Sequence, residues 1–376
     1  MNEPVQRYAP GQHPDLPPPA TMVGALGWLR KNLFASWRDS VLTVACIALL
    51  VWLIPPVVNW AFIDAIWTAA NRDDCVKSAD AACWGFVGKR FQQFMYGLYP
   101  LEERWRVDLA AAILILGVVP LFFSRFKGRK WFALFVLVLY PFVAFFLLQG
   151  GWLGLRIVET QLWGGLMVTM VIAIVGCVGS LPFGILLALG RRSRMPVVRT
   201  FCIVFIEVWR GVPLITVLFM ASVMLPLFLP EGVNFNDLLR ALVGVTIFAS
   251  AYMAEVVRGG LQAIPKGQFE AADAMGLSYW KAHRLIILPQ ALKIVIPGIV
   301  NQFVALLKDT SLVAIVGLFD FFGIIDSATK DPNWLSRNVP YTGYVFAAAV
   351  YWALCFGISR YGMRLEKRLN TGHRRK

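Results

Sequence analysis

The chain has 376 residues, 58% of them hydrophobic, and a formal net charge of +14. Soluble proteins are about half apolar, whereas several apolar runs here approach or exceed the roughly 20 residues that cross a bilayer. These runs are continuous, which excludes the short alternating segments of a membrane β-barrel. In such a chain, excess Lys and Arg indicates basic cytoplasmic loops rather than nucleic-acid binding.

We therefore expect an all-α polytopic membrane protein with about eight transmembrane helices. The expected spans are 40–62, 107–123, 131–148, 163–189, 199–227, 238–257, 294–316 and 344–363. Pro55 and Pro56 are expected to kink or end the outer part of the first span. With this arrangement the dense basic clusters fall on one side of the membrane, which predicts that both termini are cytoplasmic.

The segments before and between the first spans are polar. Residues 1–39 are expected to form a cytoplasmic tail that ends in a surface helix at about 24–37, without a cleavable signal peptide. Residues 64–106 are expected to form a periplasmic loop with room for a small helical excursion. Cys75 and Cys83 flank a polar segment of this loop. They could form a disulfide or remain two free thiols, and neither alternative is favoured.

The other cysteines and the histidines suggest no metal site. Four cysteines lie in or beside apolar runs and are expected to be inert small hydrophobes: Cys46, Cys177, Cys202 and Cys355. The histidines lie in polar segments without ligand-like companions: His13, His283 and His373.

A polar, amphipathic segment, 270–289, separates two long apolar runs. It should begin with a short helix at Glu270, turn at Gly276, and continue as a second short helix that Pro289 closes. Tyr279 and Trp280 stand beside basic residues in the second helix. The segment is too polar to span a bilayer and too apolar for a free loop. It indicates a docking surface at the membrane face, or else an amphipathic surface helix without a partner.

This segment resembles the EAA loop of type I ABC-importer permeases, including its internal spacing. The matching residues are Glu270, Ala271, Ala272, Gly276, Ile286, Leu288 and Pro289. The resemblance implies that they form a coupling helix that seats in a cleft of a cytoplasmic ATPase.

Three further stretches, 207–214, 251–260 and 308–312, resemble the polar-amino-acid permeases of that group. The resemblance covers about 150–370 and implies a five-helix permease core with a cytoplasmic coupling loop at 258–289. Three accessory helices within 40–149 precede this core, and a basic tail, 371–376, follows it. The extended N-terminal part resembles the larger permease subunits of broad-specificity L-amino-acid importers from Gram-negative bacteria.

The resemblance also implies the partners of the chain in the inner membrane. They are a cytoplasmic ABC ATPase dimer, a periplasmic amino-acid-binding protein and a second homologous permease, with a heterodimer favoured over a homodimer. No Walker A pattern is present, so ATP and Mg are expected on the ATPase and this chain is expected to be no enzyme. Membrane lipids, and no nucleic acid, complete the expected surroundings.

Ionisable groups in the first half of the core are candidates for function, because charge inside a membrane is costly. Glu207 and Arg210 are three residues apart and can pair on one helix face, as a structural pair or gate element. Glu255 could hold the ammonium group of a substrate, or it could pair with Arg258 one turn later.

Polar residues after Pro297 and Gly298 are the other candidates for the substrate path. Asn301 and Gln302 follow this helix-disturbing pair, where unpaired backbone suits a site at membrane depth. By resemblance the region lines the midplane cavity, and Gln302 is neutral where a cationic-amino-acid permease is acidic. The alternative is an interhelical hydrogen bond between subunits. The remaining candidates are Lys308, Asp309, Thr310 and Ser311, which by resemblance lie near the outer gate. Lys308 could attract a substrate carboxylate or could equally pair with Asp309, and the hydroxyls could cap a helix break.

Two other functions can be weighed. A secondary transporter predicts internal repeats and transport by this chain alone, but no repeat is visible and the amphipathic segment would have no use. An intramembrane enzyme would need a motif such as H-E-x-x-H, and none is present.

Overall fold

The structure is a computed structural model that describes residues 24–77, 80–122, 128–152, 154–230, 232 and 235–369. Most of the expected N-terminal tail and the expected basic tail, 371–376, lie outside the described residues. The chain divides into two compact units, Met1–Ala65 with Asp80–Ala82, and Ile66–Ala79 with Cys83–Lys376. The two units are described separately.

The first unit contains the first expected span. α1 (Gly24–Asn32) precedes α2 (Trp37–Val58), which passes into a π-helical turn, η2 (Asn59–Ile63). The Ser36 hydroxyl caps α2 by accepting a hydrogen bond from the Asp39 N–H at 3.2 Å. The expectation that the two prolines end this span is wrong. Both lie inside α2, and the helix changes to the wider π geometry only at Asn59, three residues after Pro56.

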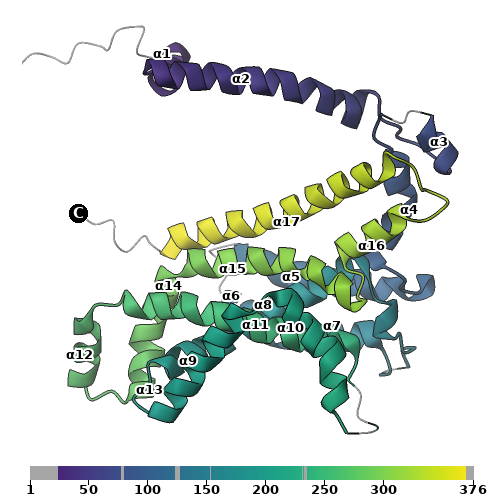
Figure 1. The fold of residues 1–376 in the computed structure, drawn as a ribbon. Helices are drawn as coiled ribbons and strands as arrows, with labels where there is room; N and C mark the ends of the chain where they lie inside the picture. The colour runs from purple at the N-terminus through teal and green to yellow at the C-terminus, as the bar shows by residue number, and fades with distance from the viewer. Residues whose placement is uncertain are drawn as a thin grey trace, which may run out of the picture. The chain divides into compact units, whose positions relative to one another are not determined.

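The centre of the second unit is the pair α8 (Gly165–Arg191) and α11 (Asp237–Gln262), which make the most extensive helix contact of the protein (Figure 1). Small residues of α8 allow this approach. A Cβ at Gly179 would lie 2.7 Å from the Thr246 side chain, and one at Gly184 would lie 2.7 Å from Met253 Cβ. Glycine at these positions therefore lets the two helices approach closely.

Other helices surround this pair. α15 (Ile296–Asp309) packs along α17 (Val339–Leu369), and a 3₁₀ segment, η9 (Thr310–Val316), extends α15. The accessory part supplies α5 (Arg104–Phe122) and a broken helix made of α6 (Arg129–Leu134), the π turn η4 (Phe135–Leu139) and α7 (Tyr140–Gln149).

The expected fifth span is bent, not straight. α9 (Pro196–Gly211) and the stretch Leu214–Phe228 meet at an angle of 104°. The second arm consists of α10 (Leu214–Phe219), η6 (Met220–Met224) and η7 (Leu225–Phe228). Val212 and Pro213 adopt extended backbone between the arms, because a proline disfavours helical geometry in the residue before it.

Short helices gather at one end of this unit: α3 (Arg72–Val76), α4 (Trp84–Tyr96), η3 (Leu101–Glu103), η5 (Thr160–Leu162) and α16 (Phe321–Thr329). Cys75 and Cys83 form a disulfide beside α3 and α4, with Cα atoms 5.6 Å apart. Asn338 donates to the Cys75 carbonyl at 3.0 Å, and the Cys83 N–H donates to the Thr342 hydroxyl at 2.9 Å. The loop expected at 64–106 therefore contains helices, and these two hydrogen bonds connect its disulfide-bonded residues to the start of α17.

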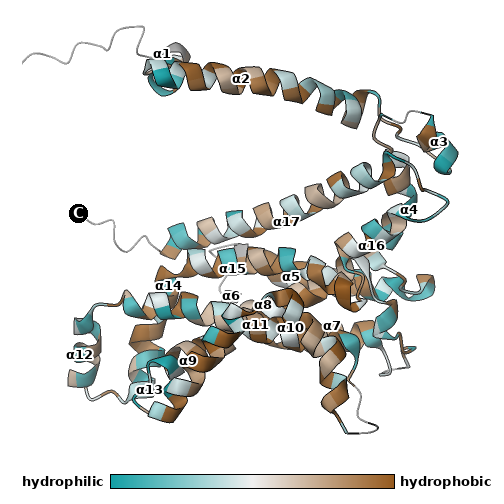
Figure 2. Cartoon of the chain, in the orientation of Figure 1, coloured by the Kyte–Doolittle hydropathy of each residue, from teal (hydrophilic) through white to brown (hydrophobic). Residues whose placement is uncertain are grey.

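Six helices of the described residues are long and apolar enough to cross a membrane, or seven if the bent pair is one span. The remaining span of the expected eight corresponds to α5, whose first turns carry Arg104, Arg106 and Asp108. No strand occurs among the residues that the structure describes. The chain is thus an all-α polytopic membrane protein, as predicted. Figure 2 shows hydrophobic residues along the spans and hydrophilic ones on short helices such as α3 and α12 (Lys266–Ala274).

Candidate functional site

Two short helices, α12 and α13 (Tyr279–Ala282), project from the end of the second unit opposite α4 and α16 (Figure 1). Gly276 joins them with a φ of +68°, a left-handed conformation that glycine adopts without strain. Its N–H bonds to the Asp273 carbonyl at 2.9 Å, and the Leu277 N–H bonds to the Ala272 carbonyl at 3.2 Å. These two bonds form a Schellman motif, which ends α12. The predicted glycine turn and second helix are therefore present, whereas the first helix begins at Lys266 and not at Glu270 as expected.

The second helix does not end at Pro289, contrary to expectation. α13 passes into a π-helical turn, η8 (His283–Ile287), and then into α14 (Leu288–Ile294). Pro289 lies in the first turn of α14. A π turn changes the bonding partners of the backbone just before this position, so a residue without an N–H fits there. The amphipathic segment is thereby joined continuously to the helix that leads into α15.

The segment has an exposed apolar face and a buried face that includes Ala272 and Ile287. Met275, Trp280 and Leu285 are 64–65% exposed. The residues that match the EAA pattern are divided between the two faces: Glu270, Ala271, Gly276 and Pro289 are exposed, Ala272 is buried, and Ile286 and Leu288 are half-buried. The last two pack on a buried cluster that includes Leu261 and Ile287. A firmly packed inner face thus supports an exposed aromatic outer face.

One arginine attaches this segment to the central helices. Arg192, just after α8, donates from Nη1 to the Leu261 carbonyl at the end of α11, 2.8 Å away. Its guanidinium carbon also lies 5.4 Å from the centre of the Phe269 ring in α12. Arg192, at the end of α8, therefore contacts both the end of α11 and the Phe269 ring of α12.

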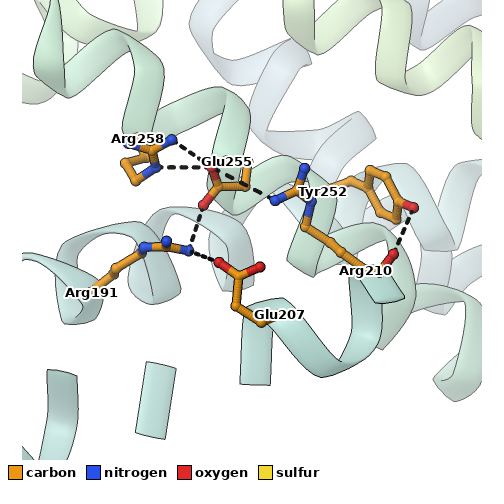
Figure 3. A network of polar contacts seen from close by, with 6 residues as sticks. All are labelled: Arg191, Glu207, Arg210, Tyr252, Glu255 and Arg258. Carbon is orange, nitrogen blue, oxygen red and sulfur yellow. Dashed lines mark hydrogen bonds and ion pairs between the residues drawn. The ribbon is translucent and has the colours of Figure 1, made fainter. Parts of the chain in front are cut away.

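A cluster of ion pairs lies near these same helix ends (Figure 3). The Glu255 carboxylate accepts hydrogen bonds from Arg258 Nη2 at 2.7 Å and from Arg191 Nη1 at 2.8 Å, and Arg210 Nη1 lies 3.9 Å away. Arg191 also donates to Glu207 Oε1 at 2.9 Å. The Glu255 side chain is only 16% exposed. This cluster therefore joins α8, α9 and α11 through one half-enclosed carboxylate.

The cluster differs from the pairing expected for two of its members. Glu207 was expected to pair with Arg210, but Glu207 contacts Arg191, and Arg210 lies near Glu255 and over the Tyr252 ring. The pairing of Glu255 with Arg258, one of two alternatives weighed above, is present. Sequence reasoning missed Arg191, which it used only as a basic marker of one membrane side. The sequence signal for Arg191 was its place at the end of one expected span, together with the acidic residues Glu207 and Glu255 near the ends of two other spans.

The candidates on α15 form a separate group. Asn301 and Lys308 are exposed, and Gln302 and Asp309 are half-buried. No contact among the described residues joins this group to Glu255. Thr310 and Ser311 donate to the carbonyls of Leu307 at 2.8 Å and Lys308 at 2.9 Å, where α15 changes to 3₁₀ geometry. Both hydroxyls bond back to carbonyls of α15 while the helix continues into η9, so the expected hydroxyl caps of a helix break do not form here. α15 itself begins at Ile296 beside Pro297.

Asp320 is a buried carboxylate that sequence reasoning did not single out. It accepts hydrogen bonds from the Gly323 N–H at 2.9 Å and from the Tyr351 hydroxyl at 2.9 Å. It caps α16 and connects that helix to α17. Its signal was an acidic residue just before an apolar run. Among the residues that the structure describes, no group of three or more His, Cys, Asp or Glu side chains could hold a metal ion.

The second unit is thus a bundle of helices that can span a membrane, with a projecting amphipathic helix pair fixed to the ends of its central helices. Residues 180–371 match the family described as "Binding-protein-dependent transport system inner membrane component". The chain belongs to this family of ABC transporter permeases. It is accordingly a multi-pass inner-membrane protein and a non-catalytic transport subunit, as its sequence predicted.

Relatives match the whole chain. An Escherichia coli (strain K12) protein described as "Inner membrane amino-acid ABC transporter permease protein YhdY" is 56% identical over 360 residues, covering 96% of this chain and 97% of the relative. The Rhodobacter capsulatus "Glutamate/glutamine/aspartate/asparagine transport system permease protein BztC" is 39% identical over 95% of this chain and 96% of its own. A solved amino-acid ABC transporter crystallised with histidines is 29% identical, with a TM-score of 0.47, over 54% of this chain and 92% of that one.

Proposed function

We propose that the chain is the permease of an ATP-driven importer for polar L-amino acids of broad specificity. The printed names of the two full-length relatives support an amino-acid substrate, and one of them names both acidic and amide amino acids. The uncharged Gln302 in the proposed path supports a substrate range that is not strictly cationic. We propose that the substrate path includes the α15 group and Glu255. The three arginine partners of Glu255 already largely balance the charge of its carboxylate.

The observation that carries the proposal is the architecture of α12 and α13. A Schellman turn fixes their relative orientation, and Trp280 and Leu285 remain exposed at 65% each. Large exposed aromatic and aliphatic side chains on a rigid frame are suited to filling a cleft of another protein. We propose that the partner is a cytoplasmic ATPase, and that its movement reaches α8 and α11 through Arg192 and the buried side of the segment.

The other components follow from this assignment. ATP and Mg are proposed to bind to the ATPase dimer, because this sequence has no Walker A pattern. A binding protein is proposed to deliver the substrate, in keeping with the description of the family. A second permease is proposed as the other half of the translocation path, with a heterodimer favoured. Within this chain, we propose that three accessory helices precede a five-helix permease core.

Both termini are proposed to be cytoplasmic. Arg191 and Arg192 lie at the end of α8 where α12 projects, and Lys266 and Arg284 belong to the projecting segment. Basic residues of short loops favour the cytoplasmic side. The disulfide lies at the opposite end, and disulfides persist in oxidising compartments such as the periplasm.

The test is a matched pair of substitutions at Gly276 in the complete transporter. Gly276→Val places a β-branched residue at φ +68°, where it is strained, whereas Gly276→Asn supplies a residue that tolerates this conformation. We expect Gly276→Val to reduce amino-acid uptake into proteoliposomes by about tenfold or more, the effect of roughly 1.4 kcal/mol, while ATP hydrolysis continues. Gly276→Asn should retain most uptake.

Insertion of both variants is checked by their yield and monodispersity in detergent. Normal uptake by Gly276→Val would refute the coupling role of the segment. Competition of uptake by glutamate, glutamine, asparagine and leucine then tests the substrate range separately, and a preference for leucine would contradict the polar specificity.

A further inference from the structure

A cavity of about 420 Å³ separates accessory helices from central helices in the second unit. α5 and α7 line one wall, and α8 and α11 line the other, with apolar side chains such as Leu114, Phe145, Ile174 and Leu242. This cavity belongs neither to the ion-pair cluster nor to the α15 group. It lies between α5 and α7 on one side and α8 and α11 on the other.

The cavity is partly open to the surroundings of the helices, since its lining residues Phe145 and Leu239 are each 48% exposed. Water is a poor occupant, since a buried water needs two to four polar partners and most of this lining is apolar. α7, α8 and α11 all belong to segments that can span a membrane. The medium that reaches such a cavity is therefore hydrocarbon.

The polar lining residues gather at one end. Asp108 lies near the start of α5, Gln149 ends α7, Thr160 precedes α8, and Asn236 caps α11. The Tyr99 hydroxyl donates to the Leu148 carbonyl at 2.7 Å, which ties the start of α5 to the end of α7. The cavity thus has a polar mouth at the helix ends and an apolar body along the helices.

Arg104 does not line the cavity itself but lies against Tyr96, a residue of its polar end. The Tyr96 hydroxyl, which lines the mouth, donates to Asp108 Oδ1 at 2.6 Å. The Arg104 guanidinium carbon lies 5.2 Å from the centre of the Tyr96 ring. Arg104 uses Nε and Nη1 to donate to the Tyr99 carbonyl and to Gln92, so its Nη2 makes no described hydrogen bond. An arginine in this position can donate to a phosphate group.

We propose that the cavity is a phospholipid site, in which one acyl chain fills the apolar body and the phosphate of the headgroup lies at Arg104. The volume is within the range of ligand pockets, about 300–1,000 Å³. Met167 and Met170 of α8 also line it, and methionine adapts to irregular flexible occupants. The lipid is a structural component that joins α5 and α7 to α8 and α11.

Two neighbouring alanines of α5 allow a controlled test. Ala111 lines the cavity, whereas Ala112 does not, and both are exposed. The full chain is purified, and the phosphatidylglycerol that it retains is measured by native mass spectrometry. We expect one tightly held phospholipid in the wild type, at least about tenfold lower occupancy in Ala111→Phe, and unchanged occupancy in Ala112→Phe, since each displaced methylene contributes substantially to binding. Equal retention by both variants, or retention of detergent alone, would overturn the proposal.

A second measurement avoids dependence on the folding of Ala111→Phe. Trp163 lines the cavity and is 3% exposed, so bulk lipid should not reach it. Phosphatidylglycerol with brominated acyl chains should quench Trp163 fluorescence, seen as a quenched component that disappears in Trp163→Phe. Arg104→Gln should reduce the preference for phosphatidylglycerol over phosphatidylcholine. Absence of Trp163 quenching would refute the site, whatever the outcome of transport assays on the proposed importer.

Discussion

Arg191 at the end of α8 and Glu255 in α11 are joined by a hydrogen bond of 2.8 Å between Nη1 and Oε1. Arg191 also contacts Glu207 on α9, and Glu255 also holds Arg258. The ends of three helices near the projecting segment are therefore connected through two side chains. Because the pair is largely shielded from solvent, its loss should affect more than surface charge.

The first prediction concerns this pair. Glu255→Gln leaves three arginines near a neutral amide, so we expect a loss of about 1–3 kcal/mol in stability, read as a fall of a few degrees in the thermal midpoint in detergent. Arg191→Gln should cost less, because Glu255 keeps Arg258. In a double-mutant cycle, the loss of stability in the double variant should be smaller than the sum of the losses in the two single variants, by at least about 0.5 kcal/mol.

Glu207 provides the control for the cycle. Its side chain is 55% exposed, and exposed ion pairs contribute about 0–1 kcal/mol. Glu207→Gln should therefore change the midpoint little. Additive effects of Arg191→Gln and Glu255→Gln would show that the two residues act independently and would contradict the prediction.

The second prediction concerns the disulfide between Cys75 and Cys83, which are eight positions apart. Closing so short a loop should contribute about 2.5 kcal/mol in the chain-entropy treatment. Reduction, or Cys75→Ser with Cys83→Ser, should lower the thermal midpoint and speed proteolysis between residues 66 and 83. Cys46→Ser, which changes an exposed free thiol in the first unit, is the control. An unchanged midpoint after verified reduction would show that the bond adds nothing to stability.

The third prediction follows from the burial of Asp320. Burial raises the pKa of its carboxyl above the ordinary value of 3.8, although hydrogen bonds from Gly323 and Tyr351 oppose the shift. The folded state therefore binds this proton more tightly than the unfolded state does. The stability from this proton is fully present below pH 3.8 and is lost as pH rises through the folded pKa.

Asp320→Asn removes this titration and serves as the reference. The midpoint of the wild type minus that of Asp320→Asn should fall as the pH is raised from about 4 to about 7. Comparison of the two proteins at each pH cancels the titration of other groups. A difference that grows with pH would show that the hydrogen bonds outweigh burial and that the pKa is lowered.

Much of the fold could be predicted from sequence because it depends on local patterns. Apolar runs of sufficient length located the spans, and Gly276 between two short amphipathic stretches located the turn of the projecting segment. The bend of 104° after Gly211 and the continuation of the helix through Pro289 could not be predicted. Proline signals a disturbance, but the packing of neighbouring helices decides whether the helix breaks, widens or bends.

The sequence by itself determined that this protein is a multi-pass helical membrane protein with an amphipathic segment that turns at Gly276, because hydropathy and turn chemistry are properties of contiguous residues. Only the tertiary structure decided which charges meet. Arg191 and Glu255 are 64 positions apart, and the cavity draws its walls from α5, α7, α8 and α11. Such contacts depend on helix rotation and crossing, which follow from side-chain packing across the whole bundle and leave no periodic signal in one segment.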